Sequence, residues 1–184
     1  MHRELPGFPR TVVAGEYGEV LRRVIVAAKE RGGLGHLPLL GLLLARSVAR
    51  LLMACDVPAA PVVLVPVPSA HAAVVERGLD LTGTLARVAA LRLRETGLAI
   101  RVRSGVELLR TPRDQAGLGR QERMVNLQGA FAWRGGRDGA VVVVDDVVTT
   151  GATLCAVTAA VRRAGVELAG ATAIAHTVKR GGVQ

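Results

Sequence analysis

One stretch constrains the fold more than any other: an apolar run, then two acids, then a turn rich in threonine that leads into a helix. Residues Ala140–Val144 (AVVVV) predict a buried strand that ends at Asp145 and Asp146. The turn TTGAT follows, and a helix is predicted from about Thr153 to Ala164, with Gly165 as its cap. A strand, a turn and a helix in this order form the repeating unit of a parallel sheet.

The rest of the chain alternates in the same way. Helices are predicted for residues 17–29, 38–53 and 81–93, and strands for residues 61–65, 100–109, 130–133 and 168–176. We therefore expect an α/β fold with a central, mostly parallel sheet flanked by helices. The first third, residues 1–58, is expected to be a helical segment of the same domain. Residues 59–180 are the expected core, and residues 181–184 a tail.

Charge narrows the range of partners. The chain has 184 residues and a formal net charge of +9, from 24 Lys and Arg against 15 Asp and Glu. Such an excess favours nucleotides, pyrophosphates or nucleic acid as partners. An arginine-rich surface with no such partner explains the charge equally well. Aromatic residues make up only 2% of the chain, which is too few to favour a stacking platform for single-stranded nucleic acid.

Cysteine use and hydropathy bear on the compartment. Cys55 and Cys155 lie far apart in sequence, and the four histidines show no metal-ligand spacing, so we expect no structural zinc and a reducing compartment. The longest uninterrupted apolar run, Leu37–Ala45, is shorter than the roughly 20 residues that span a bilayer. The expected location is the cytoplasm, without membrane insertion.

The turn after the acidic pair has the chemistry of a phosphate site. Free amides at a helix N-terminus and the helix dipole attract anions. Gly151 lets the main chain approach a ligand closely, and three threonine hydroxyls add donors. The two carboxylates are suited to accept hydrogen bonds from sugar hydroxyls. The combination describes a ribose 5-phosphate site, although Asp and Thr are also common as ordinary helix caps.

The segment VVVVDDVVTTGATL resembles the signature with which type I phosphoribosyltransferases bind phosphoribosyl pyrophosphate (PRPP). The resemblance implies that the acidic pair contacts the ribose 2′- and 3′-hydroxyls and that the following turn holds the 5′-phosphate. The substrate-binding residues that it implies are Asp145, Asp146, Val147, Val148, Thr149, Thr150, Gly151, Ala152 and Thr153.

Further stretches are similar to one branch of these enzymes, the ComF family, which is associated with DNA uptake in competent bacteria. They are V-P-V-P at residues 65–68, E-R-G-L-D at 76–80, a Q-to-GAF stretch at 115–131, and Tyr17 with Lys29. The resemblance covers roughly residues 14–178. The chain lacks the family's N-terminal four-cysteine zinc module. Leu79 and Asp80 replace a common aromatic residue and Asn, and Glu30 replaces an aromatic residue; these differences concern the acceptor side.

The resemblance also implies a mechanism. Pyrophosphate leaves PRPP while positive charge develops on the ribose, and Mg²⁺ bound with PRPP neutralises the leaving group together with basic side chains. The implied pyrophosphate loop spans residues 68–78 and the implied flexible loop residues 110–128. The residues concerned are Ser69, Arg77 and Gly78 in the first loop, and Gln115, Arg120, Arg123 and Asn126 in the second. The implied catalytic residues are Asp145, Asp146, Arg77 and Arg123. An exposed arginine is the alternative for Arg77, and a solvated charged segment for Arg120 and Arg123.

Two functions remain open at this point. The first is an enzyme that transfers a 5-phosphoribosyl group from PRPP to an unidentified nitrogen acceptor. The second is a non-catalytic module that binds PRPP or a nucleotide and contacts DNA phosphates through its basic surface, in competence or regulation. A signalling receiver domain also has an acidic pair at a strand end, but there the pair follows the first strand. A homodimer is a further expectation.

Overall fold

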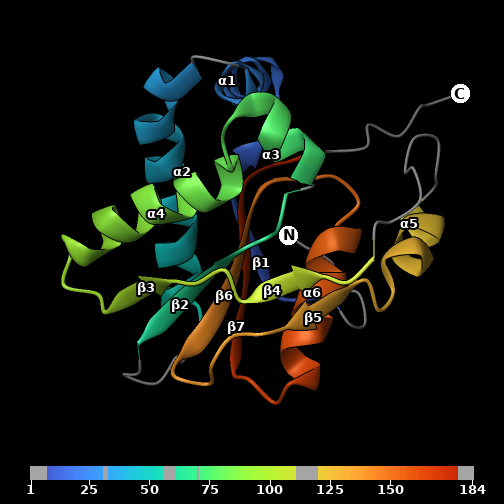
Figure 1. The fold of residues 1–184 in the computed structure, drawn as a ribbon. Helices are drawn as coiled ribbons and strands as arrows, with labels where there is room; N and C mark the ends of the chain where they lie inside the picture. The colour runs from blue at the N-terminus through green and yellow to red at the C-terminus, as the bar shows by residue number, and fades with distance from the viewer. Residues whose placement is uncertain (1–7, 31–32, 56–60, 70, 111–119, 178–184) are drawn as a thin grey trace, which may run out of the picture.

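A five-stranded parallel sheet forms the centre of the molecule (Figure 1). The structure is a computed structural model that describes residues 8–30, 33–55, 61–69, 71–110 and 120–177. In spatial order the strands are β1 (Thr11–Glu16), β7 (Leu168–His176), β6 (Ala140–Val148), β2 (Val62–Pro66) and β3 (Ile100–Val102), and every neighbouring pair is parallel. The predicted α/β class with a central parallel sheet flanked by helices is therefore confirmed.

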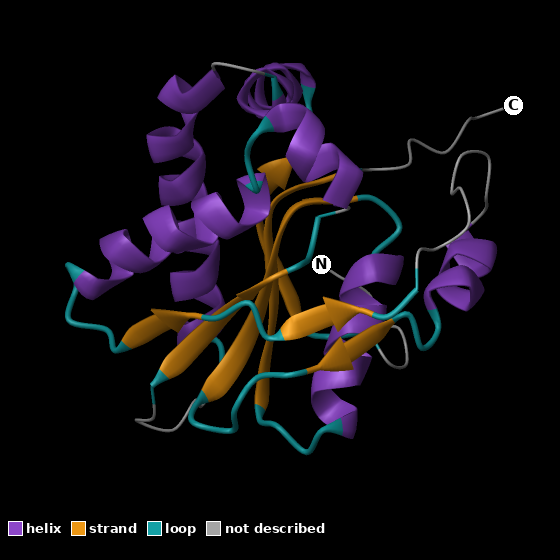
Figure 2. Cartoon of the chain, in the orientation of Figure 1, coloured by secondary structure: helices purple, strands orange, loops and turns teal. Residues whose placement is uncertain are grey.

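Helices cover both faces of this sheet (Figure 2). One face is covered by α1 (Glu19–Lys29), α2 (Leu37–Met53) and α4 (Leu81–Arg94), and the other by α6 (Ala152–Arg163). The valines of β6 serve both layers: Val142 and Val144 are buried on the first face, Val141 and Val143 on the second. A strand buried on both faces needs a continuous apolar run, which is why AVVVV marked it so clearly.

Smaller elements extend the layer that contains α6. The strands β4 (Val106–Leu108) and β5 (Phe131–Trp133) pair as a separate two-stranded antiparallel sheet, and β5 contacts α6. The helix α5 (Arg120–Leu127) also packs on α6. Two further short helices lie elsewhere in the chain. The 3-10 helix η1 (Gly33–His36) leads into α2, and α3 (His71–Arg77) precedes α4.

The first third of the chain is not purely helical, which corrects the sequence-based expectation. Strand β1 adds to the edge of the sheet, with Thr11 in register with Ala171 of β7. Most of its residues are only half-buried and the last is exposed, so the strand shows no alternation of buried and exposed positions. The expected strand over residues 100–109 is also divided, because β3 ends at Val102 and β4 begins at Val106.

Residues Gly33–Met53, which form η1 and α2, are long and apolar enough by length and composition to cross a membrane. The sequence analysis considered only the uninterrupted run within this stretch and so missed its full length. In the structure α2 is a core helix, with Leu40, Leu44 and Val48 buried against β1, β7 and α4.

We predict that Leu44→Ala lowers the free energy of unfolding by roughly 2–5 kcal/mol, because it opens a cavity in a fully buried position. The matched control is Leu42→Ala on the same helix, where the side chain is 45% exposed, and its effect should be below about 1 kcal/mol. Urea unfolding of both variants measures the difference. Equal losses would mean that α2 does not pack in this orientation.

Candidate ligand site at the carboxyl edge of the sheet

The two central strands, β2 and β6, send their connections in opposite directions. From β2 the chain passes through α4 to β3, on the outer side of β2. From β6 it passes through α6, on the other face, to β7 on the far side of β6. In open parallel sheets such a reversal leaves a crevice at the carboxyl ends of the two strands, and ligands bind there. The acidic pair and the threonine-rich turn follow β6 at this place.

Strand β6 continues beyond the point at which β2 leaves it. The last hydrogen bond between the two segments joins the Val67 amide to the Val144 carbonyl at 2.9 Å, and Pro68 follows. The sequence analysis ended β6 at Val144, but the strand runs to Val148 and stays paired with β7. Val147 and Val148, which the resemblance places among the substrate-binding residues, are strand residues packed against the two cores.

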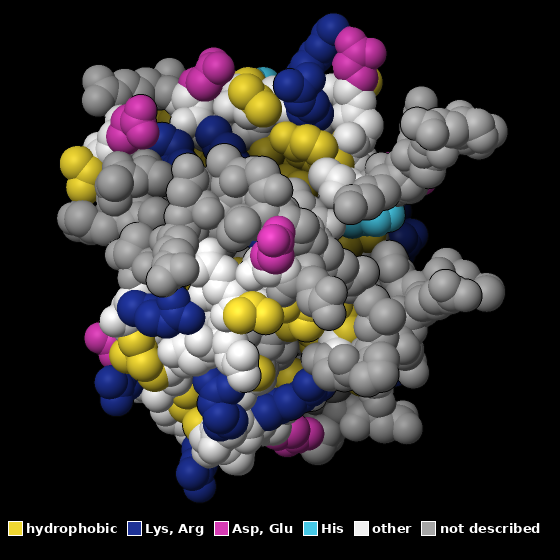
Figure 3. Space-filling view, turned by 90° about the vertical axis from the view of Figure 1, so that its right-hand side faces the viewer, with side chains coloured by type: hydrophobic (Ala, Val, Ile, Leu, Met, Phe, Trp, Pro, Cys, Tyr) yellow, Lys and Arg dark blue, Asp and Glu magenta, His cyan; other side chains and the backbone are white. Residues whose placement is uncertain are grey.

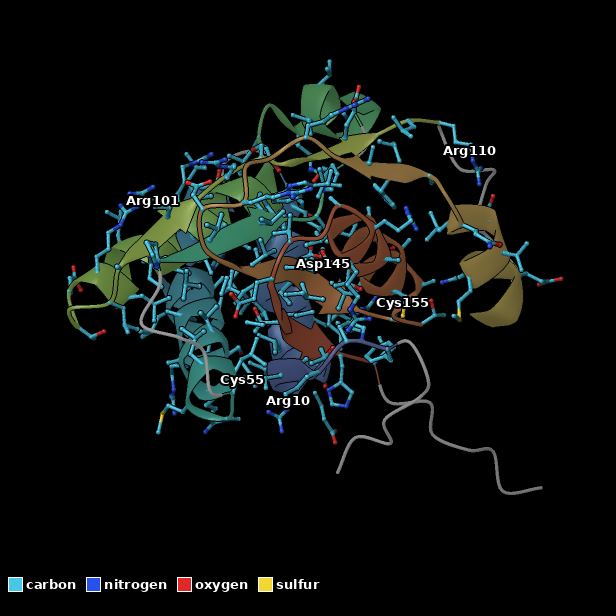
Figure 4. The ribbon with its side chains drawn as sticks, turned by 90° about the horizontal axis from the view of Figure 1, so that it is seen from below. Arg10, Cys55, Arg101, Arg110, Asp145 and Cys155 are labelled. Carbon is cyan, nitrogen blue, oxygen red and sulfur yellow. The ribbon has the colours of Figure 1, made fainter. Side chains whose placement is uncertain are left out.

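Each of the two carboxylates is held by the next amide in the chain. The Asp146 amide donates to Asp145 Oδ1 at 2.9 Å, and the Val147 amide donates to Asp146 Oδ1 at 2.7 Å. Both acids therefore lie close against the main chain at the edge of the sheet. Figure 4 places Asp145 beside α6, near the middle of the molecule.

The acidic pair is electrostatically asymmetric. Lys29, the last residue of α1, forms an ion pair with Asp146, with 2.5 Å between Nζ and Oδ2. Burial raises the pKa of Asp145 well above its usual value of 3.8, and the negative charge of Asp146 raises it further, while Lys29 lowers it. One acid thus has a cationic partner, and the other lies where its charged form is disfavoured.

The turn after β6 leads directly into the N-terminus of α6. Gly151 is the N-cap with φ at +76°, a left-handed conformation that favours glycine. The first hydrogen bond of the helix runs from the Cys155 amide to the Gly151 carbonyl. The amides of Ala152, Thr153 and Leu154 therefore have no carbonyl acceptor within the helix. The Ala152 amide lies 3.4 Å from Thr150 Oγ1. Buried Ala152 and Leu154 fix this helix end in place.

Phe8 closes one side of this turn. A Cβ on Gly151 would collide with the Phe8 ring, so the ring lies directly against the Gly151 backbone. Glycine is therefore required at position 151 for two independent reasons, its dihedral angle and this contact.

The predicted pyrophosphate loop is partly helical, which corrects its description as a turn. Within it, α3 ends at Arg77, and Gly78 follows with φ at +69°. The Arg77 side chain is half-buried, and its Nε has no hydrogen-bond partner among the described residues. Ser69 is half-buried just after β2. Both residues follow β2, and the unpartnered Nε of Arg77 is buried.

Asp80, an apparent departure from the family pattern, has a local role. It is the N-cap of α4 and accepts a hydrogen bond from the Gly83 amide at 3.2 Å. Asp and Asn serve equally well at this position. The replacement of Asn by Asp therefore preserves the start of the helix.

The predicted flexible loop is only partly described. Gln115 lies outside the described residues, and nothing is described of the Arg120 side chain. Arg123 and Asn126 lie on α5, which Figure 1 shows at the outer side of α6. Arg110 donates to the carbonyls of Asn126 and Gln128 at 2.8 and 2.9 Å, and so fastens the end of this helix. No contact of Arg123 or Asn126 with the acidic pair is seen.

Other polar groups in the described part of the chain do not form a second centre. No three His, Cys, Asp or Glu side chains among the described residues lie together as metal ligands would. Cys55 contacts Arg10 and the Ala169 carbonyl, on a side of the molecule away from Asp145 (Figure 4). On the face in Figure 3, Lys and Arg side chains are spread out with Asp and Glu among them.

No known protein-family model matches the sequence, and no curated protein matches it.

Sequence reasoning missed two contributors to this site. It named Lys29 with Tyr17 in the family resemblance but gave no partner for it, because no local signal links position 29 to position 146. It gave Phe8 no role, and only the structure shows the ring against Gly151.

We predict that Gly151→Ala is more costly than a comparable change elsewhere. Gly165→Ala, at φ +67° with only ordinary van der Waals contact to Arg137 Nη2 at 3.8 Å, should cost about 1–2 kcal/mol of unfolding free energy. Gly151→Ala should exceed this by about 1 kcal/mol, because the methyl group must also displace Phe8. In a Phe8→Ala background the two costs should become equal. An unchanged difference in that background would contradict the contact.

We predict a pH-dependent gain in stability for Asp145→Asn. The pKa of Asp145 is raised in the folded protein. Its contribution to stability is therefore complete below about pH 4 and is lost as the pH rises through the raised pKa. The variant avoids this loss, so its advantage over the unmodified protein should grow from pH 4 to pH 7. Urea unfolding across this range tests it, with the exposed Glu167→Gln as control; a constant or shrinking difference would contradict the burial of Asp145.

Proposed function

We propose that this chain is a phosphoribosyltransferase of the type I fold and the ComF branch, and that it binds PRPP at the carboxyl edge of its sheet. One observation carries the proposal: two carboxylates and an open helix N-terminus meet at the reversal between β2 and β6. Acceptors for a sugar diol and donors for a phosphate thereby lie side by side.

Each part of the ligand has a group suited to it. The amides of Thr153 and Leu154, the hydroxyls of Thr149, Thr150 and Thr153, and the dipole of α6 suit the 5′-phosphate. The carboxylates of Asp145 and Asp146 suit the ribose hydroxyls. A bound diol would also remove part of the cost of a second charge on the pair, since hydrogen bonds to a carboxylate favour its ionised form.

The leaving group lies toward β2 in this proposal. Pyrophosphate departs as the C1–O bond breaks, and Arg77 is the basic side chain next to that strand whose Nε lacks a protein partner among the described residues. Mg²⁺ enters with PRPP as part of the substrate. Because the described residues offer no group of three ligands, the ion would be held chiefly by oxygens of PRPP. The chain's own task is then to orient the ribose and to neutralise the pyrophosphate.

Calorimetry with PRPP and Mg²⁺ tests binding. The unmodified protein should release or absorb heat with a single site, whereas the double variant Asp145→Asn, Asp146→Asn should show none. Arg101→Gln, in an exposed ion pair with Asp138 far from the acids, is the matched control and should bind normally. Absence of binding by the unmodified protein would contradict the proposal.

Pyrophosphate release tests turnover. With PRPP, Mg²⁺ and a panel of nucleobases and amines, the enzyme should release pyrophosphate only with its acceptor, and Arg77→Gln should slow the release with little effect on ribose 5-phosphate binding. PRPP binding without release across the panel would indicate a binding module in place of an enzyme.

A further inference from the structure

Lys29 and Asp146 form an unusual ion pair for this chain. Asp146 keeps only 13% of its side chain exposed, whereas the acidic partners in the other ion pairs of the described residues are 48–75% exposed. The two residues come from separate elements, the end of α1 and the carboxyl end of β6. Partial burial strengthens the attraction, because less water screens it.

The contact fixes the Asp146 carboxylate at both oxygens. Oδ1 accepts from the Val147 amide at 2.7 Å, and Oδ2 lies 2.5 Å from Lys29 Nζ. With one partner on the strand and one on α1, rotation of the carboxylate about its bond to Cβ is restricted. Each oxygen retains a lone pair for another donor.

Lys29 also balances the charge of the pair. Two adjacent acids repel each other, and Asp146 is a cause of the raised pKa of Asp145 while Lys29 opposes it. The other titratable or charged groups near this edge are Glu16 at the end of β1, Tyr17 after it, Glu30 after α1, Arg77 on α3 and His176 on β7. Among the described residues, Lys29 is the cation that lowers the pKa of Asp145.

We propose that Lys29 is a positioning residue of the site: it holds the Asp146 carboxylate in the orientation in which it accepts hydrogen bonds from the diol of the bound sugar. This inference rests on the proposed function, since it assigns Lys29 to the ribose part of that site. It explains why a single lysine at the end of an otherwise arginine-bearing helix reaches back to the sheet.

The affinity for PRPP as a function of pH tests the proposal. Lys29→Met should weaken binding about tenfold at pH 7, and the acidic limb of its binding profile should move to higher pH by about one unit, because the pKa of Asp145 rises when the positive charge that lowers it is removed. Lys29→Arg should retain most of the affinity and the original limb. Arg23→Met on the same helix, whose ion pair with Glu19 is exposed, should match the unmodified protein.

A purely structural role for Lys29 gives a different result: uniform weakening at every pH, with a lower melting temperature and an unmoved limb. That result would overturn the proposal, as would normal binding by Lys29→Met. If Lys29→Met fails to fold, Lys29→Gln, which keeps a donor without the charge, should show the same displaced limb.

A measurement without ligand separates this inference from the proposed function. Carboxyl carbon NMR titration of Asp145 should show this acid ionising at higher pH in Lys29→Met than in the unmodified protein, because Lys29 lowers the pKa of Asp145. If the unmodified protein fails to bind PRPP, the proposed function is wrong, and this titration alone decides whether Lys29 controls the acidic pair. Identical titration curves would overturn the role of Lys29.

Discussion

The site depends on a single divergence in the sheet. β2 and β6 are hydrogen-bonded as far as the Val67 amide and the Val144 carbonyl, after which β2 turns away at Pro68 while β6 continues to Val148. Proline has no amide hydrogen to donate between paired strands, so Pro68 cannot continue the hydrogen bonding to β6. Beyond it the β6 backbone is bonded by its own acids on one side and by β7 on the other. The connections that follow the two strands place α4 and α6 on opposite faces of the sheet.

This arrangement holds Asp145 and Gly151 in positions that lower the stability of the fold. Burial and a neighbouring charge disfavour the ionised form of Asp145, and the φ of Gly151 excludes other residues from the cap. Such features are common where a protein binds ligands or catalyses reactions, because the fold tolerates local cost to hold reactive groups in place. The Lys29 ion pair offsets part of that cost by giving Asp146 a cationic partner from α1. The large valine-rich core around β6 supplies the stability that makes this tolerable.

The sequence predicted the elements with strong periodicity. Strand β7 was predicted at its observed bounds, and α1, α2, α4 and α6 to within a few residues, because their apolar residues recur at the spacing of buried faces. It missed β1, whose half-buried residues lack any pattern, and it stopped β6 early because acids are rare within strands. The loop after β6 was predicted as a phosphate site from local residues alone. Lys29 and Phe8 could not be found in this way, since their contacts with Asp146 and Gly151 join distant parts of the chain.

Amide NMR of the unliganded and liganded protein tests the central claim most directly, because it reports which backbone groups meet the ligand. Titration with ribose 5-phosphate should move the amide resonances of Thr149–Leu154 and of Asp145–Val147 together, whereas inorganic phosphate should move only the first group. Ligand-induced changes confined to another region of the chain, or none at all with either PRPP or ribose 5-phosphate, would contradict the assignment of this edge of the sheet as a ribose phosphate site.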